Sequence, residues 1–386
     1  MDMQSKAKKL IEMIQTASVE WKPLGEVAEL KRGKTITAKV AIDGGIPVIS
    51  GGQQPAYYHN EANRTGETIT VAGSGAYAGF IMYWDEPIFV SDAFSIKPNI
   101  EVLNTRYTYH FLLQNQGKIY NLKKGSGVPH VYPKDLALLT IPILPLETQQ
   151  KIVKILDKFT ELEATLEAEL ALRKRQYQYY RDFLLDFDNQ IGGAIADGYK
   201  GRLKDVVWKT LGEVCENLDS MRKPITSNFR KAGNVPYYGA SGIVDYVEDF
   251  ILDGDYLLVS EDGANLLARK TPIAFSVSGK IWVNNHAHIL KFRTYAERRF
   301  IEFYLNNIDI SMYISGAAQP KLNKQNLNKI RIPIPPLPEQ KKIVAILDKF
   351  DTLTHSISEG LPHEIALRRK QYEYYREQLL AFPKAA

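Results

Sequence analysis

The sequence predicts an α+β fold in which two mixed α/β domains are joined by two long antiparallel helices that form a coiled coil, with an internal pseudo-two-fold repeat. Three pairs of repeated blocks lead to this prediction. IPILPLETQQKIVKILDKF at residues 141–159 returns as IPIPPLPEQKKIVAILDKF at residues 332–350, identical at 14 of 19 positions. ALRKRQYQYYR at 171–181 returns as ALRRKQYEYYR at 366–376, and WKPLGEV at 21–27 returns as WKTLGEV at 208–214. A period of about 190 residues is too long for a solenoid, so it indicates a duplicated domain pair.

Composition bounds the class of protein. The chain has 386 residues, 45% hydrophobic and 11% aromatic, which excludes a disordered protein and is ample for two domains. No apolar run approaches ~18 residues and the first residues are charged, so we expect no membrane span, no signal peptide and a cytoplasmic location. The single cysteine, Cys215, cannot form an intramolecular disulfide, and buried filler is favoured over a reactive thiol. The net charge of +5 only weakly favours nucleic acid.

The elements are expected in the following order along the chain. Residues 1–20 form an N-terminal segment, 21–147 the first domain, 148–187 the first long helix, 188–207 a linker, 208–338 the second domain and 339–382 the second long helix. Strand-like alternation marks 67–73 and 87–98 in the first domain and 255–262 and 280–292 in the second. Residues 107–114 and 299–307 are expected to be short helices.

The two long helices follow from apolar periodicity. Apolar residues from Ile152 to Phe187, and from Ile343 to Phe382, recur mostly at steps of three, four or seven, which places one stripe on a helix of ~60 Å. A narrow stripe needs a partner helix, and the other copy is the obvious one. The aromatic packing residues are expected to be Phe159, Tyr177, Tyr180, Phe350, Tyr372 and Tyr375. Two core helices in separate domains remain the alternative.

The second helix differs from the first by four extra residues near SEGLPHEI. Four residues add about one turn, so a continuous helix would keep its stripe on one face. Gly360 and Pro362, however, are residues that interrupt helices. The prolines before both helices predict an extended lead-in that ends at a helix start.

The two copies differ most between their shared blocks. Residues 38–64 and 226–268 keep few common positions, so one frame carries two different inserts, as expected of a protein that reads two targets with one geometry. Unpaired basic residues cluster in or near these inserts: Lys31, Arg32, Lys34, Lys123, Lys124, Arg222, Lys223, Arg230 and Lys231. Loops at 125–136 and 316–327 share one design and present His130, Lys134, Gln319, Lys321 and Lys324. Seven acids between Asp245 and Asp262 weigh against a purely basic surface.

The doubled pattern IPxPPLxEQxxIVxxLD plus a long helix, with WKxLGE before each variable region, resembles the specificity subunit of type I restriction-modification enzymes. The resemblance spans nearly the whole chain, although Leu144, Glu147 and Thr148 depart from it. It implies a non-catalytic protein with two target-recognition domains. Each domain would read half of a split, asymmetric site in double-stranded DNA, and the helices would set the gap. Two methyltransferase subunits would dock on the frame and restriction subunits would join the same assembly. S-adenosylmethionine, ATP and Mg²⁺ would belong to those partners.

DNA contacts are expected from polar residues of the loops, with Lys and Arg on phosphates and other side chains on base edges. In the first domain these are Gln53, Gln54, Arg64, Ser74, Tyr77, Lys123 and His130. In the second they are Arg222, Arg230, Asn265, Arg269, Lys270 and Lys321. An ordinary surface role is the alternative at each position.

Three short patterns could indicate an enzyme or a metal site. AGSGAYAG at 72–79 lacks dinucleotide or Walker spacing, so a tight turn or a close approach to phosphate is favoured. Glu29-x-Lys31 is the only echo of a nuclease, and His286 with His288 lacks a third metal ligand, so neither a catalytic nor a metal site is expected. A duplicated coiled-coil scaffold that binds only proteins is the rival function.

Overall fold

A computed structural model describes residues 3–187, 205–316 and 319–383. Most of the predicted linker, residues 188–204, lies outside the described residues. The chain divides into two compact units. Unit 1 comprises the chain up to Ala168 and the segment from His363, and unit 2 comprises Glu169–Pro362. Unit 1 therefore contains blocks 21–27 and 141–159 of the first copy and block 366–376 of the second copy. Unit 2 contains blocks 208–214 and 332–350 of the second copy and block 171–181 of the first copy.

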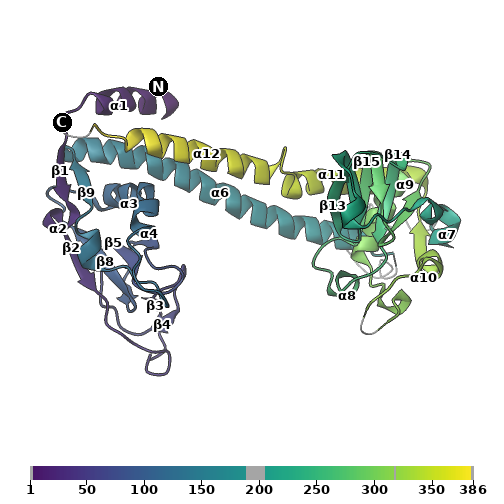
Figure 1. Cartoon of the computed structure of the whole chain (residues 1–386), viewed down its shortest axis with the longest axis horizontal. Coiled ribbons are helices and arrows are strands. Elements are labelled where there is room, and N and C mark those ends of the chain that lie inside the picture. The colour runs from purple at the N-terminus through teal and green to yellow at the C-terminus, as the bar shows by residue number, and fades with distance from the viewer. Residues whose placement is uncertain (1–2, 188–204, 317–318, 384–386) are drawn as a thin grey trace. The chain divides into compact units, whose positions relative to one another are not determined.

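Unit 1 holds mainly short elements before its long helix (Figure 1). They are α1 Met3–Gln15, β1 Glu20–Pro23, α2 Leu24–Val27, β2 Ala28–Arg32, β3 Ile46–Ile49, β4 Tyr57–His59, β5 Thr68–Ala72, β6 Ile81–Trp84, β7 Phe89–Val90, β8 Ala93–Pro98, α3 Thr105–Gln114, α4 Gln116–Tyr120, α5 Pro133–Leu136 and β9 Thr140–Ile143. Strands β2, β8, β5 and β6 form an antiparallel sheet, and β4, β3 and β7 form a second sheet. The first sheet packs its buried face against α3, with Tyr107 and Phe111 in the core.

Unit 2 builds one larger sheet. Its elements are β10 Val207–Thr210, α7 Leu211–Val214, β11 Glu216–Asn217, η1 Asp219–Met221, η2 Ser227–Phe229, β12 Ala232–Gly239, β13 Gly242–Val247, β14 Leu252–Ser260, α8 Asn265–Ala268, β15 Ala274–Val283, β16 Ala287–Lys291, α9 Tyr295–Asn307, η3 Ser311–Tyr313, α10 Lys324–Lys329, β17 Arg331–Ile334 and α11 Leu337–His355. The sheet order is β11-β16-β14-β15-β12-β13. The predicted strands and short helices of both domains are thus confirmed in type, although 87–98 and 280–292 each hold two strands, whole or in part, and the turn between them.

The repeated blocks meet each other as strand pairs. In unit 1 β1 pairs with β9, so that Trp21 faces Pro142, and in unit 2 β10 pairs with β17, so that Trp208 faces Pro333. Proline lacks an amide hydrogen and is tolerated in these short two-stranded ribbons. Helix α6, Leu146–Leu185, follows β9, and α11 follows β17. The extended lead-in predicted from the prolines is therefore confirmed.

In each unit an arginine of an earlier helix binds the aspartate of the LDKF repeat, although the two arginines lie at different positions of their helices. In unit 1 Arg106 of α3 binds Asp157 of α6, with Nη2 and Oδ1 2.6 Å apart. In unit 2 Arg299 of α9 binds Asp348 of α11, with Nη2 and Oδ1 2.8 Å apart. Burial would lower the pKa of Arg299, but its carboxylate neighbours raise it, so this cation stays charged.

The second long helix is not continuous, so the prediction of one helix over 339–382 is wrong in this respect. Helix α11 ends at His355 and α12, Leu361–Leu379, begins after a bend. Gly360 has a φ of +92°, and a Cβ there would lie 2.3 Å from the carbonyl oxygen of Thr352. Only glycine adopts this backbone without strain, and Pro362 cannot donate a helical hydrogen bond. The extra residues therefore form a connection instead of adding a helical turn.

Candidate nucleic-acid interface

Two loops of unit 1 are joined by backbone hydrogen bonds. The amide of Val131 donates to the carbonyl of Gly73 at 3.0 Å, and the amide of Gly75 donates to Pro129 at 3.0 Å. Lys124 and His130 exchange amide–carbonyl bonds of 2.9 and 2.8 Å. The two glycine-containing segments, 73–80 and 123–132, therefore form one surface, which we call the loop surface of unit 1.

Unit 2 repeats this scaffold bond for bond. The amide of Leu322 donates to Glu261 at 2.7 Å, and Gly263 donates to Pro320 at 3.1 Å. Ser315 and Lys321 exchange bonds of 2.9 and 2.7 Å, as Lys124 and His130 do in unit 1. Segments 261–264 and 315–322 form the loop surface of unit 2. In hydrogen bonding Asp262 thus takes the position of Ser74, and Lys321 takes that of His130.

The side chains on the shared scaffold differ in chemistry. In unit 1 the hydroxyl of Ser74 donates to the carboxylate of Asp92. In unit 2 Asp262 Oδ2 lies 2.7 Å from Nδ1 of His286. Asp92 and His286 are themselves equivalent, because their carbonyls accept from the amides of Gly73 and Glu261 at 3.2 and 2.9 Å. Hydroxyl and carboxylate in one unit are replaced by carboxylate and imidazole in the other.

Several predicted residues of the first domain gather at the loop surface of unit 1. Gln53, Gln54 and Tyr77 line a shallow hollow with Gly52 and Phe80. The ammonium group of Lys123 lies 3.3 Å from the carbonyl of Ala76 and 4.5 Å from the ring of Tyr120. Residues from separate parts of the sequence therefore face one another here.

The side of this surface is formed by an aromatic residue that the sequence analysis did not single out. The ring of Tyr132 stacks on His130 with centroids 6.0 Å apart, and the guanidinium of Arg32 lies 5.5 Å from it.

Lys31 and Lys34 are exposed on and after strand β2. Lys124 binds Asp135 at 2.8 Å, and Lys134 lies 6.0 Å from the ring of Tyr132. Alignment of the two repeats would have found Asp92, because His286 occupies the equivalent place.

Arg64 does not belong to this surface. Its Nε donates to Ser95 Oγ at 2.7 Å, Nη1 to the carbonyl of Asn63 at 2.7 Å and Nη2 to the carbonyl of Arg32 at 2.9 Å. All three nitrogens bind the protein, and burial lowers the pKa of the guanidinium. Such an arginine holds loops together, which does not favour the predicted DNA contact.

Three predicted arginines of unit 2 are also engaged inside the fold. Arg222 binds Glu261 and lies 3.6 Å from Asp219, and Arg230 binds Asp245 at 3.1 Å. Arg269 donates to the carbonyls of Leu305 and Ile308 at 3.3 and 2.5 Å, and burial lowers its pKa. Asn265 closes a local turn through Thr271.

The exposed predicted residues of unit 2 are mainly lysines. They are Lys223, Lys231, Lys270, Gln319, Lys321 and Lys324. Lys231 lies 3.6 Å from Glu248, and Lys321 lies 3.1 Å from Glu261 while 52% of its side chain stays exposed. Of this set, Lys321 is the residue whose backbone belongs to the shared scaffold and whose head group reaches solvent.

A buried charge cluster underlies the loop surface of unit 2. Donor atoms of Asp219, Glu261 and His288 lie within 4.8 Å of one another, a spacing that suits a metal ion. Arg222 and Lys321 already pair with these carboxylates, however, and His288 Nε2 lies 2.7 Å from the carbonyl of Leu322. Burial would raise the pKa of Asp219, but hydrogen bonds from His288 and a backbone amide hold it below its ordinary value. A metal would have to displace two cations, so charge pairing explains the cluster better.

The two histidines, the glycine-rich segment and the cysteine singled out in the sequence each have a structural role in unit 1 or unit 2. His286 binds Asp262 whereas His288 binds Asp219, so the two imidazoles serve different carboxylates. Residues 72–79 form a tight turn, one of the two expectations for this segment, with Gly75 at φ +83° and the amide of Ala78 donating to the carbonyl of Gly75 at 3.0 Å. Burial raises the pKa of Cys215 to about 12, so this thiol is protonated and inert at neutral pH.

The predicted helix-packing aromatics lie in ring contacts within each unit. In unit 1 Phe159 of α6 stacks on Tyr375 of α12 at 5.1 Å, and the hydroxyl of Tyr372 lies 3.1 Å from Nδ1 of the buried His110. In unit 2 the rings of Tyr177 and Tyr180 stack on Phe350 at 6.0 and 5.5 Å. Within the ranges that the structure describes, no helix is both long and apolar enough to cross a membrane.

Known proteins match both repeats. The family described as type I restriction modification DNA specificity domain matches residues 18–172 and 204–367. A putative type I restriction enzyme specificity subunit of Haemophilus influenzae is 43% identical over 180 residues, 46% of each chain. The type I restriction enzyme EcoR124I/EcoR124II specificity subunit of Escherichia coli is 36% identical over 269 residues, which are 63% of this chain and 61% of that subunit. The chain thus spans about half of the first of these relatives and about three fifths of the second.

Solved structures agree on the fold. A crystal structure of a type I restriction-modification system S subunit from M. genitalium has a TM-score of 0.68 at 19% identity, and the alignment covers 96% of this chain and 98% of that one. At this identity the likeness concerns the fold alone. The family match in both repeats establishes membership, and the chain belongs to the type I restriction modification DNA specificity domain family, with one copy of the domain in each half of its sequence.

Proposed function

We propose that the chain reads a two-part site in double-stranded DNA, one half with the loop surface of each unit. The observation that supports this most is the shared hydrogen-bonded scaffold with different side chains. Ser74, Asp92 and His130 in unit 1 are replaced by Asp262, His286 and Lys321 in unit 2. A common backbone with exchanged donors and acceptors is what reading two different half-sites requires.

The exchanged groups are those that distinguish base edges. An ammonium such as that of Lys321 donates to guanine O6 and N7, a carboxylate such as that of Asp262 accepts from the cytosine amino group, and a serine hydroxyl does both. Amides of the kind that Gln53 and Gln54 carry pair with adenine. Lysines at the edge of the loop surface, such as the half-buried Lys123, would bind phosphates and fix the register without reading sequence.

The long helices would hold the two units at a fixed spacing as an antiparallel coiled coil. Support comes from contacts inside unit 1, where Phe159 meets Tyr375 while Glu163 and Glu167, further along α6, meet Arg369, which is earlier in α12. Contacts that advance on one helix and retreat on the other indicate opposite directions. In unit 2 Tyr177 and Tyr180, which lie in the repeated block 171–181 of α6, stack on Phe350 of α11.

Two methyltransferase subunits would dock on this frame, and restriction subunits would join the same assembly. The repeated block at 171–181 and 366–376 exposes matching apolar residues, Leu172 and Tyr179 in one copy and Leu367 and Tyr374 in the other, each 46–57% exposed. Tyr179 meets Tyr180, and Tyr374 meets Tyr375, at the same 76° ring angle. Exposed apolar residues repeated in one geometry suit two copies of one partner. S-adenosylmethionine, ATP and Mg²⁺ would be held by those catalytic partners, and this chain would be non-catalytic.

The proposal is tested by selecting bound duplexes from a library with two randomised segments, using the chain together with its methyltransferase subunit. The variant that carries both Ser74→Asp and His130→Lys should change the preferred bases in one half of the site and leave the other half unchanged. Lys154→Ala, which removes an exposed lysine from helix α6, is the control and should leave both halves unchanged. Absence of any sequence preference in the unmodified complex would instead support a scaffold that binds only proteins.

Positioning and reading can be separated in the same assay. Lys123→Ala should weaken binding to all sequences alike and lower the slope of log affinity against log salt by about one unit. A change of preferred bases in this variant would show that Lys123 reads sequence.

A further inference from the structure

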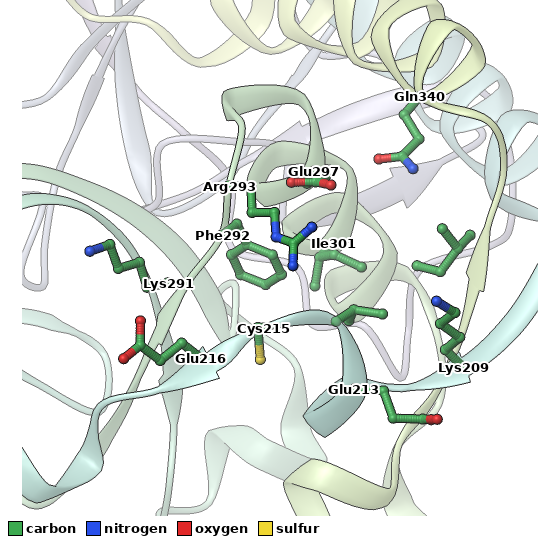
Figure 2. A pocket seen from close by; sticks show the side chains of 12 residues that line it. Lys209, Glu213, Cys215, Glu216, Lys291, Phe292, Arg293, Glu297, Ile301 and Gln340 are labelled. Atoms are coloured by element: carbon green, nitrogen blue, oxygen red, sulfur yellow. The ribbon is translucent and has the colours of Figure 1, made fainter.

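Unit 2 contains a pocket of about 790 Å³ that lies away from its loop surface (Figure 2). It is bounded by α7 and the residues after it, by the end of β16, by α9 and by the start of α11. The residues that the argument uses are Lys291, Phe292, Arg293, Ile301, Ile334 and Gln340. Figure 2 shows Phe292 and Ile301 toward the centre of the pocket and Gln340 reaching toward it from α11.

The pocket exists because one connection is short. In unit 1 Glu29 pairs with Lys97 in the sheet, and Asn104 caps α3, so six residues, 98–103, separate strand and cap. In unit 2 the equivalent pair is Glu216 with Lys291, and Thr294 caps α9, so two residues, 292–293, separate them. The four additional residues of unit 1 have no counterpart in unit 2.

In unit 1 this longer connection fills the space and binds a glutamine of the long helix. Leu103 is fully buried in the core. Gln149 Nε2 donates to the carbonyls of Val102 and Leu144 at 2.9 and 2.8 Å, and Gln149 Oε1 accepts from the amide of Asn104 at 2.8 Å. The glutamine amide therefore has partners at both ends.

Gln340, the equivalent residue of unit 2, keeps one of these three bonds. Its Nε2 donates to the carbonyl of Pro335 at 2.8 Å, as Gln149 does to Leu144. The cap amide that would reach its Oε1 is instead that of Thr294, which donates to Glu297 at 3.0 Å. Gln340 is 4% exposed, and among the described residues its Oε1 accepts no hydrogen bond. Gln340 Oε1 reaches solvent at the wall of a pocket lined by both charged and apolar side chains, so it can accept a hydrogen bond from an occupant.

We propose that the pocket receives an extended peptide segment of a partner protein, bound once per chain. A backbone amide of this segment donates to Gln340 Oε1, as Asn104 does to Gln149 in unit 1. An apolar side chain lies against Phe292, Ile301 and Ile334 in the place that Leu103 fills in unit 1. Lys291 and Arg293, which are exposed beside the pocket, suit an acidic residue two positions before the apolar one, as Glu101 stands before Leu103. Because unit 1 fills its own space, the occupant has one site per chain, unlike the two-copy partners proposed above.

The chain itself supplies the probe. A blocked heptapeptide with the sequence of residues 98–104, PNIEVLN, is titrated into the full chain, and the methyl resonances of Ile301 and Ile334 are followed by NMR. They are assigned with Ile301→Val and Ile334→Val. We expect both resonances to shift and saturate at one peptide per chain, whereas those of Ile141 and Ile152 in unit 1 stay in place. A peptide carrying Leu103→Asp should bind at least tenfold more weakly.

Two variants of the chain make the test specific. Gln340→Leu should weaken the peptide at least fivefold, and Lys342→Ala, on the outer side of α11, should not change its affinity. Replacing residues 292–293 by residues 98–103 should fill the pocket and abolish binding while the unit remains folded. Absence of a shift at millimolar peptide, equal binding of the Leu103→Asp peptide, or undiminished binding by the filled variant would overturn the proposal. Self-association of the chain that the filled variant abolishes would overturn it too, because the occupant would then be a second copy.

Discussion

Phe159 and Phe350 occupy the same place in the LDKF repeat but differ in burial, which makes them a matched pair. Phe159 is 1% exposed and stacks on Tyr375 with centroids 5.1 Å apart. Truncation of a buried phenylalanine costs about 3–5 kcal/mol, and the lost aromatic pair lies within that range. Phe159→Ala should therefore destabilise unit 1 by about 4 kcal/mol. Phe350→Ala should destabilise unit 2 by about 2 kcal/mol, because Phe350 is only half-buried against Tyr177 and Tyr180.

The assay uses the four tryptophans, which divide evenly between the units. Trp21 and Trp84 belong to unit 1, and Trp208 and Trp282 belong to unit 2. Two backgrounds, each with the tryptophans of one unit changed to phenylalanine, report urea unfolding of the other unit by fluorescence. The free energy of each unit is compared only where its transition is two-state. A loss below about 1.5 kcal/mol for Phe159→Ala, or a larger loss for Phe350→Ala, would refute the packing argument.

Three further outcomes follow from single residues. Gly360→Ala should destabilise unit 2 by about 1–3 kcal/mol, because φ is +92° and the new Cβ would meet Thr352, and unchanged unfolding of unit 2 would contradict this. Burial, opposed by Asp157, lowers the pKa of His110 below its ordinary 6.5, so the unfolded chain binds the proton more tightly and unit 1 should lose stability as pH falls below about 6.5. In His110→Gln that part of the pH dependence should disappear from urea unfolding curves. Cys215, which is half-buried and whose pKa is raised to about 12 by loss of solvent, should react with a thiol reagent about tenfold faster per pH unit between pH 7 and 9, and a rate at pH 7 that no longer rises with pH would contradict the raised pKa.

The frame could be predicted from sequence because its information is repeated. The blocks that contain Trp21 and Ile141 return at Trp208 and Ile332. Within each copy the two blocks supply the two strands of one antiparallel ribbon. The apolar stripe predicted α6 within a few residues of its observed bounds. The break before α12 involves Gly360 and Pro362, which the sequence marks as residues that interrupt helices, but periodicity alone did not decide between a connection and an added helical turn.

The candidate site was less predictable because its contacts are non-local. Arg64, Arg222 and Arg269 look like surface cations in sequence, but their partners Ser95, Glu261 and Ile308 lie at least 31 residues away. The bond between Gly73 and Val131 that creates the loop surface of unit 1 likewise joins distant segments. Segment composition therefore pointed to loops that the structure brings together, and burial decides which of their basic residues remain available for a contact with DNA.

Exchange of one insert shows whether the two units read DNA independently. Residues 28–135 are replaced by the corresponding region of a relative, the chain is expressed with its methyltransferase subunit, and the methylated sequence is determined across a host genome. One half of the methylated site should change while the other half and the spacer stay the same. A change in both halves would contradict modular reading, because the two loop surfaces would then not read DNA independently.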